Sequence, residues 1–153
     1  MHPSSPSTDQ IGRMLSSLTG GATGDLFRDA VMSARDGIVI ATVAPGVREH
    51  PITFANPGFE RLTGYNQAEI LGRDCRFLQL DDRDQPEVQI IRDAIHAGRD
   101  CLVTLRNYRK DGSMFWNELS LAPMRGPDGR VWRYVGIQKD VTARMQDGQH
   151  PTG

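Results

Sequence analysis

The chain has 153 residues, of which 38% are hydrophobic and 24% charged, and its formal net charge is −1. This length suits one compact domain with short flanking segments. The near-neutral charge gives no reason to expect a surface for nucleic acid or an anionic membrane. The longest apolar stretch, around residues 37–44, is too short to span a bilayer, and no basic start followed by an apolar run marks a leader peptide. We therefore expect a cytoplasmic protein.

The sequence contains two cysteines, Cys75 and Cys101, and four histidines. A disulfide is unusual in a small cytosolic domain. The cysteines do not form a C-x-x-C pair and the histidines are scattered, so we expect no metal site. Cys75 therefore needs another explanation.

The first residues predict a short helix ahead of the main domain. Four apolar residues recur at the spacing of one helix face, and Gly20-Gly21 follows them: Ile11, Met14, Leu15 and Leu18. A helix this short needs a partner surface. Its apolar stripe either folds back onto its own domain as a cap or forms a dimer contact, and the sequence favours neither. We assign residues 1–24 to this N-terminal extension.

A second helix is expected over residues 25–35, with these residues on one side: Leu26, Phe27, Ala30, Val31 and Ala34. Two β-branched segments, 37–43 and 52–55, then read as strands. Asn56-Pro57 is typical of a helix start, with asparagine as the cap and proline at the first helical position. Short helices should follow, and then a turn around Cys75.

The part of the chain from residue 84 onward predicts one more helix and three strands. The helix is expected over 84–97, with Pro86 in its first turn and Gly98 as its stop. Strands over 101–110 and 113–124 flank Asp111-Gly112, a strong hairpin signal. A third strand is expected over 131–140, and a final helix can begin at 141–146. This order predicts an α+β domain over 25–140, with a five-stranded antiparallel sheet and helices packed on one face, and a short tail over 141–153.

The segment Gly72-Arg-Asp-Cys-Arg-Phe-Leu-Gln79 resembles the G-x-N-C-R-F-L-Q signature of the LOV (light-oxygen-voltage) subfamily of PAS domains. The resemblance runs from about Gly37 to Asp140 and includes Phe59-x-x-Leu-Thr-Gly-Tyr65, Ile91-Arg-Asp-Ala-Ile95, Arg106-Asn-Tyr-Arg-Lys-Asp-Gly112, Phe115-Trp-Asn117 and Gly136-Ile-Gln-Lys-Asp140. It is most similar to short bacterial LOV photoreceptors without an effector domain. The resemblance implies a PAS fold, a flavin mononucleotide (FMN) chromophore and a role in blue-light signal transduction.

In this family the position of Cys75 holds the photoactive thiol. The resemblance implies that its sulfur forms a reversible bond to the flavin C4a carbon on illumination. The cofactor supplies that chemistry, and the protein sets the distance and orientation of the sulfur relative to the flavin. The preceding residue is usually asparagine, and here it is Asp74, which can oppose ionisation of the thiol or accept a proton. The lifetime of the bond is therefore open. Cys101 matches no motif and is expected to be inert.

Three arginines match phosphate-binding positions of the family. Arg76 and Arg92 match phosphate-binding arginines of the family, and Arg83 matches an extra arginine of some short bacterial members. A guanidinium suits a phosphate dianion because their hydrogen bonds are charge-assisted and often bidentate. For Arg83 a purely solvated role is as open as a binding one.

A flavin ring has one polar and one apolar edge, so its pocket needs amide side chains at one end and aliphatic ones at the other. Asn107, Asn117 and Gln138 lie on three successive expected strands, where asparagine is disfavoured. The resemblance implies that the two asparagines bond the pyrimidine edge and that Gln138 faces the ring atoms that change on illumination. It places the following residues in the same pocket: Asp74, Leu78, Gln79, Val88, Ile91, Ile95, Leu105, Leu119, Leu121 and Tyr134. Tyr134 replaces the usual phenylalanine, and its hydroxyl needs a partner.

FMN is favoured over FAD because no insertion that could house an adenylate separates the Cys75 turn from the next helix. Riboflavin is also less expected than FMN. The alternative function is a light-independent PAS sensor or dimerisation module that binds flavin or another ligand. A haem sensor would need an axial ligand, for which His96 is the only candidate, near the helix end. A flavoenzyme would need a nicotinamide-binding glycine fingerprint, which the sequence lacks. We expect no enzymatic activity.

No kinase, DNA-binding or cyclase segment follows Asp140 in this sequence. We therefore expect the signal to pass through the terminal segments, through a homodimer or to an unknown downstream protein, without nucleic acid or membrane.

Overall fold

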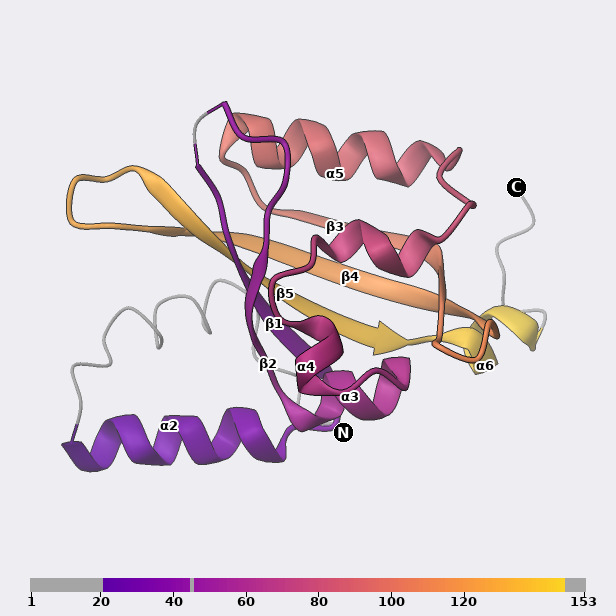
Figure 1. The fold of residues 1–153 in the computed structure, drawn as a ribbon, viewed down its shortest axis with the longest axis horizontal. Coiled ribbons are helices and arrows are strands. Elements are labelled where there is room, and N and C mark those ends of the chain that lie inside the picture. Colours follow the sequence, from indigo (N-terminus) through magenta and orange to yellow (C-terminus); the bar gives the residue numbers. More distant parts are fainter. Residues whose placement is uncertain (1–20, 45, 148–153) are drawn as a thin grey trace.

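The computed structural model describes residues 21–44 and 46–147 (Figure 1). Its centre is a five-stranded antiparallel sheet with the strand order β2-β1-β5-β4-β3. The strands are Gly37–Thr42 (β1), Ile52–Ala55 (β2), Cys101–Tyr108 (β3), Met114–Arg125 (β4) and Val131–Asp140 (β5). The helices are Gly21–Ser33 (α2), Pro57–Thr63 (α3), Gln67–Ile70 (α4), the 3-10 helix Cys75–Gln79 (η1), Pro86–Ala97 (α5) and Thr142–Gln146 (α6). The predicted α+β architecture is confirmed. The stripe expected over 11–18 lies outside the described residues.

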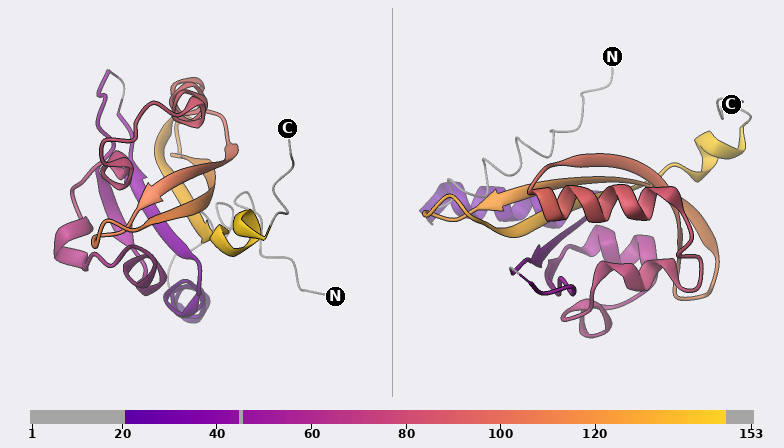
Figure 2. Two further views of the ribbon diagram at one scale, coloured as in Figure 1. Left: turned by 90° about the vertical axis from the view of Figure 1, so that its right-hand side faces the viewer. Right: turned by 90° about the horizontal axis from the view of Figure 1, so that it is seen from above.

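The sheet has helices on both faces. α3, α4, η1 and α5 cover one face, called the inner face here, as predicted. α2 packs on the opposite face, where its Phe27 and Val31 form a buried cluster with Ile38, Ala122 and Val135. Figure 2 shows α5 running alongside the strands and α6 projecting beyond the end of the sheet.

Helix α2 differs from its sequence prediction in extent and in its buried face. It begins at Gly21, four residues before the expected start, and ends at Ser33. Leu26 is 71% exposed and Ala30 is also exposed, so these two residues of the expected apolar side face solvent. Phe27 and Val31 carry the contact because they lie four residues apart, on one face of the helix. The face of α2 that is buried against the sheet is therefore narrower than the apolar face expected from the sequence.

Asn56 begins α3 as predicted, and it also joins three elements. Its Oδ1 accepts hydrogen bonds from the backbone N–H of Phe59 (3.0 Å) and of Ile38 (2.7 Å). Its Nδ2 donates to the carbonyls of Val31 and Asp36, at 3.0 Å each. A fully buried amide is stable only when its donors and acceptors are paired. This residue therefore fixes α2, β1 and α3 relative to one another.

Proline explains where α5 begins. The helix was expected to start at Asp84 but starts at Pro86, since Gln85 is extended with φ −118° and ψ 132°. The residue before a proline is disfavoured in the helical region. The expected hairpin is confirmed, with Gly112 at φ 87° in its turn.

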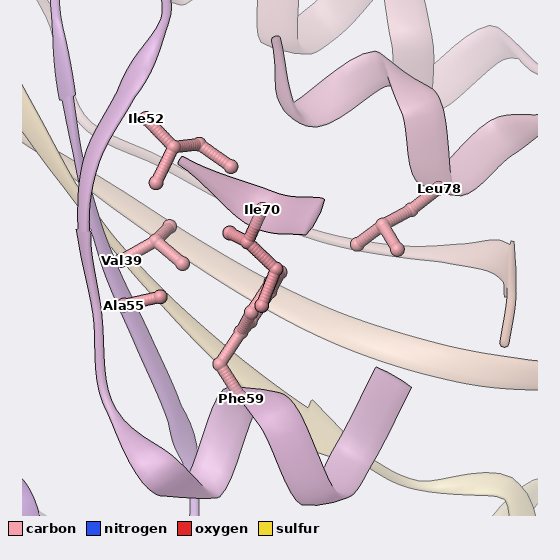
Figure 3. Packing of buried hydrophobic residues seen from close by; sticks show 6 residues of the cluster. All are labelled: Val39, Ile52, Ala55, Phe59, Ile70 and Leu78. Carbon is pink, nitrogen blue, oxygen red and sulfur yellow. The ribbon is translucent and has the colours of Figure 1, made fainter. Parts of the chain in front are cut away.

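A cluster of apolar side chains fills the space between β1 and β2 and the helices over them (Figure 3). Its members are Val39, Ile52, Ala55, Phe59, Ile70 and Leu78, and Phe59 and Ile70 are completely buried. Cys75 and Phe77 pack against it. The cluster thus anchors η1 to the sheet and sets the position of the Cys75 turn. Within the described residues no helix is long and apolar enough to cross a membrane.

Candidate functional site

The Cys75 turn is held by the carboxylate of Asp74, which caps η1. Asp74 Oδ1 accepts from the backbone N–H of Arg76 (2.9 Å) and from its Nε (3.1 Å). The other oxygen, Oδ2, accepts from the backbone N–H of His50 at 2.8 Å. An N-cap aspartate stabilises the first turn of a helix by pairing its free N–H groups. The turn that carries Cys75 is therefore fixed both to its own helix and to the segment before β2.

The thiol of Cys75 is protonated at neutral pH. Burial raises its pKa to about 12, and the neighbouring carboxylate of Asp74 acts in the same direction. A protonated thiol is a poor nucleophile and resists ordinary oxidation. Of the two roles open for Asp74, this geometry favours the one that opposes ionisation. Cys75 and Cys101 are both free of disulfide bonds.

Three amide side chains lie buried on the inner face of neighbouring strands. Asn107, Asn117 and Gln138 are each at most 4% exposed. Asn117 Nδ2 donates to Asn107 Oδ1 at 2.8 Å, and Asn107 Nδ2 donates to the carbonyl of Arg106 at 2.9 Å. Leu119 is the cross-strand partner of Gln138, which places Gln138 next to the strand of Asn117. The strands thus gather the amides that the sequence singled out.

Three buried amide oxygens have no hydrogen-bond partner among the described residues: Gln79 Oε1, Asn117 Oδ1 and Gln138 Oε1. They come from η1, β4 and β5. Leaving a buried acceptor unpaired costs about 1–3 kcal/mol, and native structures keep few such groups. The three oxygens therefore favour a ligand with hydrogen-bond donors on this face. A fourth unpaired atom, His50 Nδ1, lies in the residue beside Asp74, and burial lowers the pKa of this histidine.

The apolar residues predicted for the pocket line the same face from β3, β4 and α5. Val88 and Leu105 are buried with Val103, and Ile91 and Leu119 pack against them. Leu78 is buried in the cluster under η1. Leu121 and Ile95 are half-buried. The inner face thus combines an aliphatic region with the amide cluster.

The three predicted phosphate-binding arginines lie on η1, on the loop after it and on α5. Arg76 is engaged by Asp74, and its side chain is 39% exposed. Arg83 and Arg92 are exposed; Arg83 Nε donates to the carbonyl of Leu80 (3.0 Å) and Arg92 Nη1 to Gln89 Oε1 (3.3 Å). No hydrogen bond within the described residues joins these arginines to one another. Each of the three guanidiniums thus donates through a single nitrogen in the described part of the chain and keeps the others for an anion.

The hydroxyl of Tyr134 finds partners at the end of α5. It donates to the carbonyls of Ala94 and Arg99, whose oxygens lie 3.2 and 3.0 Å away. Burial raises its pKa to about 12. The extra hydroxyl at this position therefore ties β5 to the helix.

Sequence reasoning missed a polar clamp that closes the loop before α5. Arg106 donates to both oxygens of Asp82, at 2.7 and 2.9 Å, and the Tyr108 hydroxyl donates to the same carboxylate at 2.6 Å. Gln85, only 4% exposed, accepts from the Arg106 N–H (2.8 Å) and donates to its carbonyl (3.0 Å). These pairs are 21 to 26 residues apart in sequence, so no local pattern signals them.

A family model described as a PAS domain matches residues 35–143. A protein named blue-light photoreceptor, from Listeria monocytogenes, is 44% identical over 118 residues, which are 77% of this chain and 46% of that protein. Two solved structures are similar. An RNA-binding light-oxygen-voltage receptor is 44% identical, with a TM-score of 0.78, and covers 88% of this chain and 38% of its own. A light-oxygen-voltage domain studied with a flavin analogue is 39% identical, with a TM-score of 0.68. The match covers 82% of this chain and 94% of that domain.

The match to the domain studied with a flavin analogue spans nearly the whole length of that domain. This chain spans less than half the length of the first curated relatives. The sequence signature around Cys75, the sheet order and these likenesses agree. The chain belongs to the PAS family and, within it, to the light-oxygen-voltage domains.

Proposed function

We propose that this chain is a blue-light photoreceptor that binds FMN on the inner face of its sheet. On illumination, the sulfur of Cys75 forms a reversible bond with the flavin C4a carbon. The observation that carries this proposal is the set of unpaired buried amide oxygens on the face that η1 and its protonated Cys75 thiol cover. Two relatives named as blue-light photoreceptors support the same role.

The residues of the inner face fit a flavin ring. Asn107 and Asn117 offer a linked pair of amides to a pyrimidine edge. Gln79 and Gln138 add amide side chains, each with a donor and an acceptor, from η1 and β5. Leu105, Leu119 and the other aliphatic residues suit the apolar part of the ring. When bound, the flavin supplies light absorption and the electrophilic carbon. Cys75 supplies the sulfur and a proton, and its burial keeps the proton in place in the dark.

FMN fits better than FAD or riboflavin. Arg76, Arg83 and Arg92 offer guanidiniums for a terminal phosphate, which riboflavin lacks. Only six residues separate η1 from α5, and Asp82 and Gln85 clamp them onto β3, which leaves little room for an adenylate.

We place the output at the end of β5 and in the segments beyond the core. Gln138 lies two residues before the end of the strand, and α6 follows directly. A homodimer through the terminal segments, or a downstream protein, would read the change in the cytoplasm, and the domain itself would turn over no substrate. The stripe Ile11, Met14, Leu15 and Leu18, which motivates the dimer, lies outside the described residues.

The absorption spectrum of the purified protein before and after blue light tests the proposal. We expect a structured blue absorption band that is lost on illumination and returns in the dark. A yellow protein that does not bleach would support the alternative, a light-independent flavin-binding PAS sensor. A colourless protein that takes up no added FMN would contradict both flavin readings.

A further inference from the structure

The side-chain amide of Gln138 lies between two glycines. Gly37 is its cross-strand neighbour on β1, and Gly136 precedes it by two residues on β5, on the same face of the sheet. A Cβ atom added to Gly37 would lie 3.3 Å from Gln138 Oε1. A Cβ atom added to Gly136 would lie 3.2 Å from Gln138 Nε2. The oxygen of the amide thus lies next to the space that a side chain at Gly37 would take, and its nitrogen lies next to the space that one at Gly136 would take.

Backbone conformation does not explain these glycines. Neither Gly37 nor Gly136 is among the glycines with a positive φ. Gly37 begins β1, and Gly136 lies inside β5. Glycine in a strand interior weakens the strand and often marks a close approach. Here the Gln138 amide comes close to both positions, together with Phe59 at Gly37 and with Leu121 and Val39 at Gly136. Space is therefore the reason for glycine at both positions.

We propose that Gly37 and Gly136 are positioning residues that let the Gln138 amide adopt two orientations, and that light signalling uses this freedom. The inference rests on the proposed function. Flavin N5 accepts a hydrogen bond in the dark and carries a proton once the thiol has added. Gln138 can answer both states only by exchanging its oxygen and nitrogen, since an amide offers a donor at one end and an acceptor at the other.

A methyl group on either side would disfavour that exchange. Contacts of 3.2–3.3 Å to Cβ are tighter than ordinary van der Waals contact, so the amide would have to move to accommodate one. Gln138 is also only 2% exposed, so the residues packed around it limit where its amide can turn. The glycine cradle, Gly37 and Gly136, is therefore the space in which the turn takes place.

The cradle lies beside the part of the strand where the output begins. Gly37 and Gln138 line a solvent-open groove of about 380 Å³, together with Lys139 and Asp140, the last residues of β5. Asp140 Oδ2 forms an ion pair with Arg109 Nη2 at 2.6 Å. Its other oxygen, Oδ1, accepts a hydrogen bond from the backbone N–H of Thr142, the first residue of α6. A turn of the Gln138 amide thus changes the wall of a groove that also contains Asp140, which bonds the first residue of α6.

Gly136→Ala is the sharper test of the two positions. Its added methyl meets only side-chain ends: Leu121 Cδ2 at 3.1 Å, Gln138 Nε2 at 3.2 Å and Val39 Cγ2 at 3.3 Å. At Gly37 the methyl also meets the backbone Cα of Phe59 at 3.1 Å, which moves less readily. Gly126→Ala is the matched control, because it has no positive φ and its nearest contact, Asp128 Oδ1, is an ordinary 3.4 Å away.

The experiment measures light-minus-dark hydrogen exchange of the full chain at residues 139–147, with bleaching and flavin content recorded for every variant. It also follows the ¹⁵N-labelled side-chain amide of Gln138 by NMR in the dark. We expect Gly136→Ala to keep its flavin, to shift the Gln138 amide resonances and to reduce the light-induced exchange difference at least twofold. Gly126→Ala should match wild type in all three measurements.

A double mutant separates positioning from general damage. In a Gln138→Leu background, Gly136→Ala should cause no further loss of the exchange difference, because residues that act through one another are not additive. An equal fractional loss in both backgrounds, or an undiminished difference in Gly136→Ala, would overturn the proposal. If Gly136→Ala loses flavin, Gly37→Ala is measured in the same way. Loss of flavin from both would show that the room serves the ring instead, whereas a wild type that never bleaches would defeat the proposed function itself.

Discussion

Asn117 on β4 and Asn107 on β3 are joined side chain to side chain, with Nδ2 of Asn117 donating a 2.8 Å hydrogen bond to Oδ1 of Asn107. The bond fixes both amides on the inner face and occupies one of the two lone pairs of Asn107 Oδ1. It leaves Oδ1 of Asn117 buried without a partner in the described part of the chain. Two asparagines paired reciprocally, each donating to the oxygen of the other, would leave neither oxygen without a partner. The pair is instead arranged so that its free oxygen meets a third group, which the proposed flavin provides.

Replacing Cys75 tests the photochemistry directly. Cys75→Ala removes the sulfur but leaves the amide cluster and the arginines intact. We expect the protein to keep its yellow colour, to lose bleaching completely and to fluoresce more strongly, since the excited flavin loses its reaction partner. Cys101→Ala is the control and should bleach as wild type does. Spectra recorded before and after blue light decide the outcome, and a Cys75→Ala protein that still bleached would sink the assignment.

The arginines should differ in their effect on flavin affinity. Arg76→Ala removes a charge-assisted bond to a phosphate, which is worth roughly 1.5–3 kcal/mol, so the dissociation constant should rise about tenfold or more. Arg92→Ala should behave alike and Arg83→Ala more weakly. Titration of flavin-free protein with FMN and with riboflavin measures this, because riboflavin binding should be insensitive to all three changes. Equal FMN affinity in wild type, Arg76→Ala and Arg92→Ala would remove the phosphate role.

Asp74 should control the ionisation of Cys75. Asp74→Asn keeps a side-chain oxygen to cap η1 but removes the charge that helps to hold the thiol pKa near 12. We expect the thiol pKa to fall, while burial keeps it above its ordinary value. The pH dependence of alkylation of flavin-free protein, with Cys101 replaced by alanine, reports this pKa. An unchanged alkylation profile would mean that the carboxylate does not act on the thiol.

The clamp between Asp82 and Arg106 should make stability depend on acidic pH. The hydrogen bonds from Arg106 and Tyr108 lower the pKa of Asp82 to about 2, whereas an unfolded aspartate titrates at about 4. A depressed pKa gives stability that is complete above pH of about 4 and is lost as the pH falls towards 2. Urea unfolding between pH 5 and 2 should show a steeper loss for wild type than for Asp82→Asn. Asp81→Asn, in the same loop, is the control and should follow wild type; identical pH profiles for wild type and Asp82→Asn would contradict the role of the clamp.

The sequence predicted most of the sheet and the placement of the amides, because strand alternation fixes which residues share a face. Asn107, Asn117 and Gln138 fall on the inner face for this reason. The buried face of α2 was less predictable, since Leu26 and Phe27 are equally apolar and only packing on the sheet selects Phe27. Gln85 could not be identified at all. Its partner, Arg106, lies on a strand brought close only by the fold.

Gln138 is expected to convert the photochemistry into a structural change. Gln138→Leu keeps similar bulk between the two glycines but cannot exchange a donor for an acceptor. It should still bleach, should shift the flavin absorption because a polar contact is lost, and should show a smaller light-dependent change at α6. The reason is its place on β5, two residues before Asp140, whose carboxylate bonds the N–H of Thr142 at 2.9 Å. Light-minus-dark hydrogen exchange over 21–24 and 139–147 measures the change, with Gln89→Leu on the exposed face of α5 as a control for the loss of an amide. Equal exchange differences in wild type and Gln138→Leu would mean that the signal leaves the pocket by another route.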